Sequence, residues 1–173
     1  MKYTVNMKKE LSVVFVVHKN EEGNFSIMMG KQAPGKKLAG IRNGYGGKCE
    51  DGETTLECAF RELKEELNLE NNFGIVVSQN DLQKVGKVLM DEKVIDFFVL
   101  ELPNKIAPPS DNSEFVDTKW FDLENPVDFV GEMLSGDEEV VGGLKRYLES
   151  GVTFEINKTG NQELEKQTKN IFN

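Results

Sequence analysis

The chain has 173 residues, of which 38% are hydrophobic and 29% charged, and its formal net charge is −9. This composition is typical of a single globular domain large enough to bury a core, and no apolar run approaches the length of a membrane span. The negative charge excludes a polynucleotide as the main partner, because nucleic-acid backbones are bound by a surplus of Lys and Arg.

The first part of the chain predicts a β-hairpin. Residues 11–18 are rich in β-branched side chains, which is typical of a buried strand, and residues 24–30 return as a second strand. Residues 32–40 combine Pro, Gly and Lys and indicate a loop. Strand character resumes near Ile41, and we expect the glycine-rich residues 44–47 to form a turn.

A helix is predicted to begin at Thr54. Thr54 and Glu57 have the spacing of a capping box, in which each side chain bonds the backbone N–H of the other residue. Apolar residues then recur at helical spacing and predict one buried stripe. The stripe consists of Leu56, Ala59, Phe60, Leu63 and Leu67. Asn68 follows at the expected helix end, where a left-handed conformation is common.

The second part of the chain predicts another hairpin, a short strand, a helix and a last strand. These elements are expected at residues 82–90, 94–102, 119–121, 137–149 and 152–156. The segment 127–136 is left unassigned, and the tail 161–172 is ambiguous between helix and strand. We expect an α/β (α+β) fold in a single domain covering residues 1–173, with a core at about 10–157 and a tail at 158–173.

Cysteine and histidine usage limits the chemistry. The two cysteines, Cys49 and Cys58, are too few for a disulfide framework, and the N-terminus lacks a small-residue cleavage site. We therefore expect a reducing, cytoplasmic location. His18 is the single histidine, which argues against a His-rich metal site or a Ser-His-Asp relay.

Three carboxylates of the first helix form the main candidate site. Glu62 and Glu66 are one helical turn apart and Glu65 lies beside them, on the side away from the apolar stripe. Like charges at this spacing repel, and carboxylate oxygens are the ligands that Mg²⁺ and Mn²⁺ prefer. The alternative is a solvated acidic helix face. Arg61 can pair with Glu53 across the turn and fasten the loop to the helix.

The same residues resemble a known family signature. Residues 47–69 read G-x5-E-x7-R-E-L-x-E-E-x-N-L, which resembles the Nudix box, G-x5-E-x7-R-E-U-x-E-E-x-G-U with U aliphatic. Each fixed position matches except the last glycine, which is Asn68 here. Asn is the next-best residue for a left-handed helix end, so the departure is mild.

The resemblance implies an α/β/α sandwich with a mixed central sheet, hairpins and two main helices, and a hydrolase that uses Mg²⁺ or Mn²⁺. The implied metal ligands are the Gly46 carbonyl, Glu62, Glu65, Glu66 and an acid from a later loop, for which Glu114 is the candidate and Asp117 the alternative. The implied catalytic residues are Glu62, Glu65, Glu66, Arg61 and Glu53. The implied substrate contacts are Lys31, Asn43, Gly47, Lys48 and Asp137.

Segments outside the box resemble the MutT-type branch, which hydrolyses oxidised purine nucleoside triphosphates such as 8-oxo-dGTP. The segments are 43–48, 84–86 and 119–121. The resemblance implies a nucleoside monophosphate and pyrophosphate as products, and a monomer or homodimer with no membrane or polynucleotide partner. This branch is expected to have aromatic residues at position 42 and near position 134, but this sequence has Arg42 at the first and no aromatic around Leu134. The alternatives are a dinucleoside polyphosphate, ADP-ribose or nucleotide sugar as substrate, or a non-catalytic nucleotide-binding module.

Overall fold

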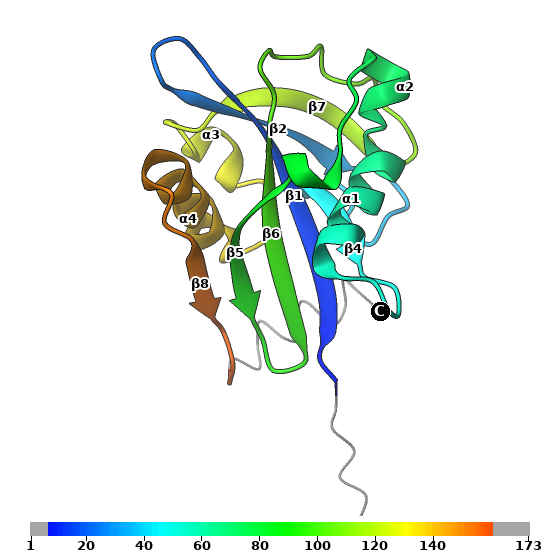
Figure 1. The fold of residues 1–173 in the computed structure, drawn as a ribbon, viewed down its shortest axis with the longest axis vertical. Coiled ribbons are helices and arrows are strands. Elements are labelled where there is room, and N and C mark those ends of the chain that lie inside the picture. The colour runs from blue at the N-terminus through cyan, green and yellow to red at the C-terminus, as the bar shows by residue number, and fades with distance from the viewer. Residues whose placement is uncertain (1–6, 161–173) are drawn as a thin grey trace, which may run out of the picture.

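The structure, a computed structural model, describes residues 7–160. In that range one mixed sheet lies between two helical layers (Figure 1). Its strands are β1 (Lys9–Lys19), β2 (Phe25–Gln32), β3 (Arg42–Asn43), β4 (Tyr45–Lys48), β5 (Gln83–Leu89), β6 (Lys93–Glu101), β7 (Phe115–Asp122) and β8 (Phe154–Asn157). The main order is β3-β2-β1-β6-β5-β8, with β4 paired to β1 and β7 paired to β2.

The helices cover both faces of the sheet. On one side lie α1 (Thr55–Glu66) and α2 (Leu69–Phe73), and on the other lie α3 (Val127–Val130) and α4 (Asp137–Ser150) (Figure 1). A short 3₁₀ turn, η1 (Gln79–Asp81), precedes β5. Each layer has its own core cluster against the sheet. The predicted α/β/α sandwich is therefore confirmed.

Strand β1 is the centre of this arrangement because both of its faces are buried. Val14 and Val16 face α1, whereas Phe15 and Val17 face the α3–α4 layer. Strand β6 runs parallel to β1 along one edge. The other edge pairs antiparallel with β2 near its end and with β4 near its start. The continuous β-branched run of the sequence thus reflects burial on two sides.

The glycine-rich stretch differs from the prediction. Residues 45–48 form strand β4 and not a turn, and Gly46 pairs with Val13 of β1. None of Gly44, Gly46 and Gly47 has a positive φ. A Cβ on Gly46 would lie 2.0 Å from the Ser12 carbonyl oxygen, so glycine is needed here for close approach and not for an unusual backbone angle.

The other predicted elements are present with changed bounds. Strand β7 is longer than the predicted 119–121, and the last strand begins at Phe154 and not at residue 152. Two short helices, α2 and α3, were not predicted. Asn68 does adopt the left-handed conformation, with φ 46°, and its side chain also caps α2. The ambiguous tail, from residue 161, lies outside the described residues.

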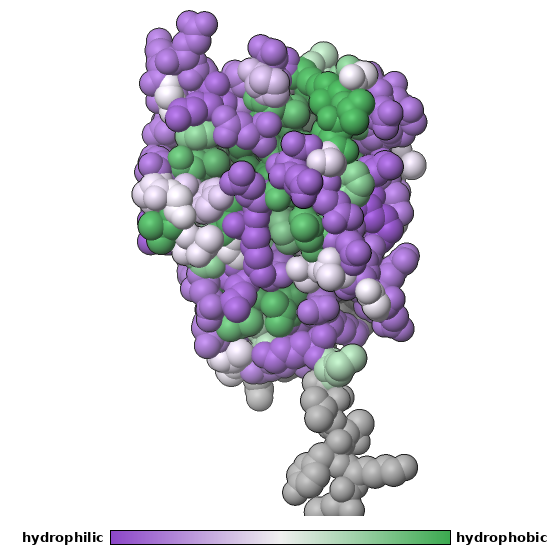
Figure 2. Space-filling view, in the orientation of Figure 1, coloured by the Kyte–Doolittle hydropathy of each residue, from purple (hydrophilic) through white to green (hydrophobic). Residues whose placement is uncertain are grey.

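Hydrophilic and hydrophobic residues both contribute to the surface. Figure 2 shows that the face viewed in Figure 1 is covered mainly by hydrophilic residues, with hydrophobic ones in separate groups. Among the helices of residues 7–160, none is long and apolar enough to cross a membrane.

Candidate active site

The start of α1 is fixed by the predicted capping box. The Thr54 hydroxyl accepts a hydrogen bond from the Glu57 amide at 3.2 Å, and the Glu57 carboxylate accepts one from the Thr54 amide at 2.7 Å. These bonds satisfy backbone donors that have no partner within the helix. The cap therefore sets where every later residue of α1 points relative to the preceding loop.

An arginine fork fastens this loop to the helix, as the sequence predicts. Arg61 donates from Nε and Nη2 to the two carboxylate oxygens of Glu53, at 2.7 and 3.1 Å. Arg61 also donates to the Lys48 carbonyl at 3.3 Å and to Glu62 at 2.8 Å. Hydrogen bonds from Arg61 and from the Glu50 amide lower the pKa of Glu53 to about 2. Glu53 is therefore a permanently charged anchor at neutral pH.

Glu62 and Glu66 face β4 across the space that the glycines leave open. The Gly46 amide donates to Glu66 Oε2 at 3.3 Å. A Cβ on Gly47 would lie 2.7 Å from Glu62 Oε1, so only glycine leaves room for that carboxylate. Burial raises the pKa of Glu66 to about 9, and the charge of Glu62 adds to the effect. Burial also raises the pKa of Glu62, against the opposing effect of Arg61.

Two further predicted ligands lie at the edge of this pair. Glu65 is more exposed, at 59% of its side chain, and lies 3.4 Å from Arg61. Glu114 forms an ion pair with Lys36 at 2.8 Å, and its negative charge adds to the effects that raise the pKa of Glu66. The alternative acid, Asp117, is held elsewhere by Arg42 at 2.7 Å.

These carboxylates suit a hard divalent cation. The negative charge of Glu62 repels a negative charge on the more buried Glu66 and so adds to the effect of burial on the pKa of Glu66. A divalent cation would relieve that repulsion, and the donors that the family resemblance implies, the Glu carboxylates and the Gly46 carbonyl, are all oxygens, as Mg²⁺ and Mn²⁺ prefer. The residues present therefore fit the metal that the resemblance implies.

The predicted substrate contacts occupy different surroundings. The side-chain oxygen Oδ1 of Asn43 accepts a hydrogen bond from the Gly44 amide at 2.8 Å, which leaves the side-chain NH₂ group of Asn43 to donate. Lys48 is exposed at the end of β4. Lys31 is held by Glu132 at 3.1 Å and Asp117 at 3.5 Å. Asp137 begins α4, and burial raises its pKa to about 6.

Arg42 has a structural role that the sequence did not predict. Its side chain is fully buried, and it donates to Glu132 at 2.6 Å and to Asp117 at 2.7 Å. It also bonds the Met29 carbonyl and lies 4.7 Å from the centre of the Phe121 ring. A guanidinium in this position ties β2, β3, β7 and the segment after α3 together beside Asn43. Strand β3 has only two residues, so no alternation along it could have indicated that Arg42 points inward or which acids it meets.

Tyr45 is a second buried residue of this region whose surroundings the sequence does not predict. Its ring is buried and packs edge-on against Phe115. Within residues 7–160 its hydroxyl has no hydrogen-bond partner. Burial raises the pKa of Tyr45, and the charge of Glu66 adds to this effect, so the hydroxyl lies near the carboxylate site.

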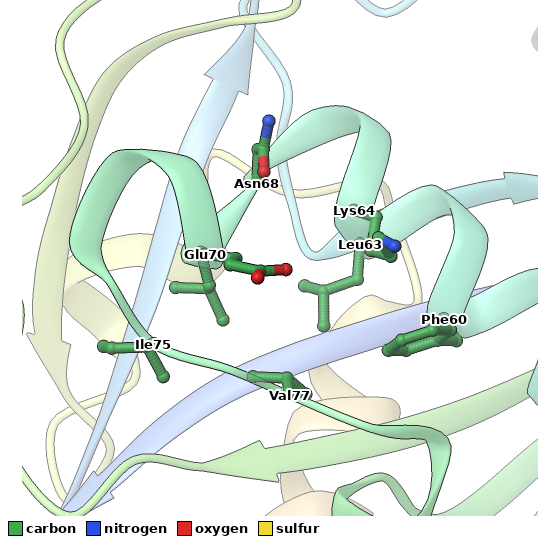
Figure 3. A pocket seen from close by; sticks show the side chains of 8 residues that line it. Phe60, Leu63, Lys64, Asn68, Glu70, Ile75 and Val77 are labelled. Carbon is green, nitrogen blue, oxygen red and sulfur yellow. The ribbon is translucent and has the colours of Figure 1, made fainter.

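Two hollows of the surface lie apart from the carboxylates. Figure 3 shows the smaller one, about 20 Å³, where Phe60 and Leu63 of α1 face Ile75 and Val77. That volume holds about one water molecule. A wider and more polar hollow of about 490 Å³ lies beside Tyr147 of α4. Neither is lined by Glu62, Glu65 or Glu66.

The protein is thus an α/β/α sandwich whose first helix, α1, presents a group of carboxylates to the glycine-containing strand β4. Comparison with known families agrees, because a family model of the NUDIX domain matches residues 8–141. The chain belongs to the NUDIX domain family. The predicted resemblance is thereby confirmed.

The relatives with similar sequences are named for two different activities. The isopentenyl-diphosphate Delta-isomerase of Cereibacter sphaeroides (strain ATCC 17025) is 32% identical over 98 residues, which are 56% of this chain and 54% of the relative. The match thus spans about half the length of that relative. The oxidized purine nucleoside triphosphate hydrolase of Danio rerio is 30% identical over 120 residues, or 67% of each chain.

Solved structures show the same fold at low identity. The MutT protein of Bacillus halodurans superposes with a TM-score of 0.58 at 19% identity and covers 88% of this chain and 92% of its own. A Nudix hydrolase of M. smegmatis has a TM-score of 0.62 at 11% identity, with coverage of 83% and 87%. At these identities the likeness supports the fold alone.

Proposed function

We propose that this protein is a metal-dependent hydrolase that cleaves a phosphoanhydride bond of a nucleoside triphosphate. The products are a nucleoside monophosphate and pyrophosphate. The metal is Mg²⁺, with Mn²⁺ as a substitute, and it is held by Glu62, Glu65, Glu66 and the Gly46 carbonyl, with Glu114 as a further ligand. Glu53 and Arg61 hold these groups in position.

One observation carries this proposal. Glu62 and Glu66 lie together in a half-buried position against a strand whose glycines leave room for them, and the Arg61–Glu53 pair fixes the geometry. A merely solvated acidic face would place these carboxylates in water, where the pKa of Glu66 would not be raised to about 9. The full set of box acids also speaks against a non-catalytic module.

The chain's own residues perform three tasks in the proposed reaction. The carboxylates hold the cation, which neutralises the phosphates and lowers the pKa of bound water. One carboxylate of the site accepts the proton as the water oxygen bonds to phosphorus and the bridging P–O bond breaks toward pyrophosphate. Lys48 and Lys31 supply positive charge for the phosphates of the substrate.

An oxidised purine is the proposed base. The support is the Danio rerio relative named for such substrates, and Asn43, whose free NH₂ group suits the edge of a purine. Asp137 is a second proposed contact, since its raised pKa, about 6, allows it to donate or accept near neutral pH. The resemblance to diphosphate isomerases is compatible with the same metal site but with a different substrate.

A substrate panel tests the proposal. The purified protein is incubated with Mg²⁺ and, separately, 8-oxo-dGTP, dGTP, ATP, a dinucleoside polyphosphate, ADP-ribose, a nucleotide sugar and isopentenyl diphosphate. We expect the highest kcat/KM for the oxidised purine, and a loss of about a hundredfold or more in Glu66→Gln. No preference over dGTP and ATP would refute the proposed base. Conversion of isopentenyl diphosphate without any nucleotide hydrolysis would refute the proposed reaction.

A further inference from the structure

Both cysteines of the chain meet beside the arginine fork. Cys49 follows β4 and is half-buried, and Cys58 lies in α1 and is fully buried. One ligand atom each of Cys49, Cys58 and Glu53 lies within 4.8 Å of the other two. Sulfur ligands do not suit Mg²⁺, so this cluster is chemically different from the oxygen site of Glu62 and Glu66.

The geometry points to a second metal site, formed by Cys49, Cys58 and Glu53, that takes a thiophilic divalent cation such as Zn²⁺ or Cd²⁺. In a tetrahedral site with metal–sulfur bonds of 2.3 Å, the ligand atoms lie about 3.8 Å apart. The three atoms here lie within 4.8 Å of one another, so side-chain movements of about 1 Å bring them to that spacing.

Neighbouring groups support a charged cluster at this place. The Ser12 hydroxyl donates to Cys58 Sγ at 3.1 Å, an outer contact that orients the sulfur and stabilises a thiolate. Arg61 Nη2 lies 3.9 Å from the same sulfur. Two thiolates and the Glu53 carboxylate carry three negative charges, which one divalent cation and the Arg61 guanidinium balance. Without the cation, the cysteines remain neutral because burial raises the pKa of both thiols.

Occupation of this site acts on the carboxylates through a shared residue. Both oxygens of Glu53 accept hydrogen bonds from Arg61, and Arg61 in turn holds Glu62 at 2.8 Å. A metal that takes one oxygen of Glu53 weakens this fork and frees Arg61 to move. The thiophilic ion is therefore an inhibitor of the Mg²⁺-dependent reaction. This consequence rests on the proposed function, whereas the binding itself does not.

Cadmium titration of the metal-free 173-residue chain tests the binding. Thiolate-to-cadmium charge transfer absorbs in the near ultraviolet, and only two cysteines can produce it. We expect one Cd²⁺ per chain, no band in Cys49→Ala, a weakened affinity in Glu53→Gln and an unchanged band in Glu66→Gln. Cys58→Ser, which keeps a small side chain at this buried position, should also abolish the band. Circular dichroism confirms that each variant is folded.

The outcomes separate the parts of the proposal. Absence of the band, a band that survives Cys49→Ala, or one Cd²⁺ per two chains would overturn the site. In the turnover assay with excess Mg²⁺, stoichiometric Cd²⁺ should reduce the rate of the wild type by tenfold or more, while Cys49→Ala keeps its rate. A band without inhibition would overturn the coupling through Glu53. A band in a protein with no hydrolase activity would refute the proposed function and leave the metal site standing.

Discussion

Glu66→Gln is the substitution that most directly probes the energetics of the carboxylate pair. Glutamine keeps the shape of the side chain and its acceptor for the Gly46 amide, but it removes the ionisable group beside Glu62. Burial raises the folded-state pKa of Glu66 from its ordinary 4.5 to about 9. In the metal-free protein near neutral pH, folding therefore requires Glu66 to take up a proton, and we expect the variant, which needs none, to be more stable than the wild type.

The size of the effect follows from linkage. Between about pH 4.5 and 9 the folded wild type binds more protons at Glu66 than the unfolded chain does, so its free energy of unfolding falls as the pH rises. The slope is at most about 1.4 kcal/mol per pH unit. Near pH 7.5 the upper limit is thus about 4 kcal/mol, and relaxation of the carboxylate toward water reduces it.

Urea unfolding with a chelator present, at several pH values, measures this contribution. We expect Glu66→Gln to be stabilised by about 2–4 kcal/mol near pH 7.5 and to converge with the wild type near pH 4.5. Glu65→Gln is the matched control, because its exposed side chain should change stability by no more than about 0.5 kcal/mol. A Glu66→Gln variant that is less stable than the wild type across this range would refute the reasoning.

Three further predictions concern other positions. Asn43→Ala should raise KM for the oxidised purine about tenfold and leave kcat within about threefold, in steady-state kinetics; an unchanged KM would remove Asn43 from base recognition. Gly47→Ala places a Cβ 2.7 Å from Glu62 Oε1, so kcat should fall by at least about tenfold with little change in Tm. In α4, the added Cβ of Gly142→Ala meets no atom within 4 Å, so this variant should raise the free energy of unfolding by about 1 kcal/mol. The added Cβ of Gly143→Ala meets the Phe154 ring at 2.6 Å, so this variant should lower the free energy of unfolding. Equal changes of Tm in the two variants would contradict this contrast.

The sequence predicted most of the elements and the local contacts within the box. The capping box, the Glu53–Arg61 pair and the left-handed Asn68 all depend on residues close together in the chain, where spacing alone determines what can meet. The alternation of hairpins and helices predicted the α/β (α+β) class, whereas the α/β/α sandwich was implied by the family resemblance. The resemblance to a known family supplied the chemistry that spacing alone does not specify.

Features that depend on distant segments were not predicted. The buried Arg42 meets Asp117 and Glu132, which are 75 and 90 residues away, and a single sequence does not reveal such pairing. Likewise, Gly46 is a strand glycine because Ser12 of β1 approaches its backbone, a contact that the composition of the stretch cannot show. The run of glycines predicted a turn, whereas in the sheet glycine is needed so that the backbones of β1 and β4 can approach each other closely.

The most direct test of the central claim is product analysis of 8-oxo-dGTP hydrolysis with Mg²⁺ present and with a chelator. The account predicts nucleoside monophosphate and pyrophosphate in equal amounts, formed with Mg²⁺ only, and no turnover when Glu62 and Glu66 are both replaced by glutamine. Hydrolysis that persists in that double variant, or release of orthophosphate in place of pyrophosphate, would contradict it.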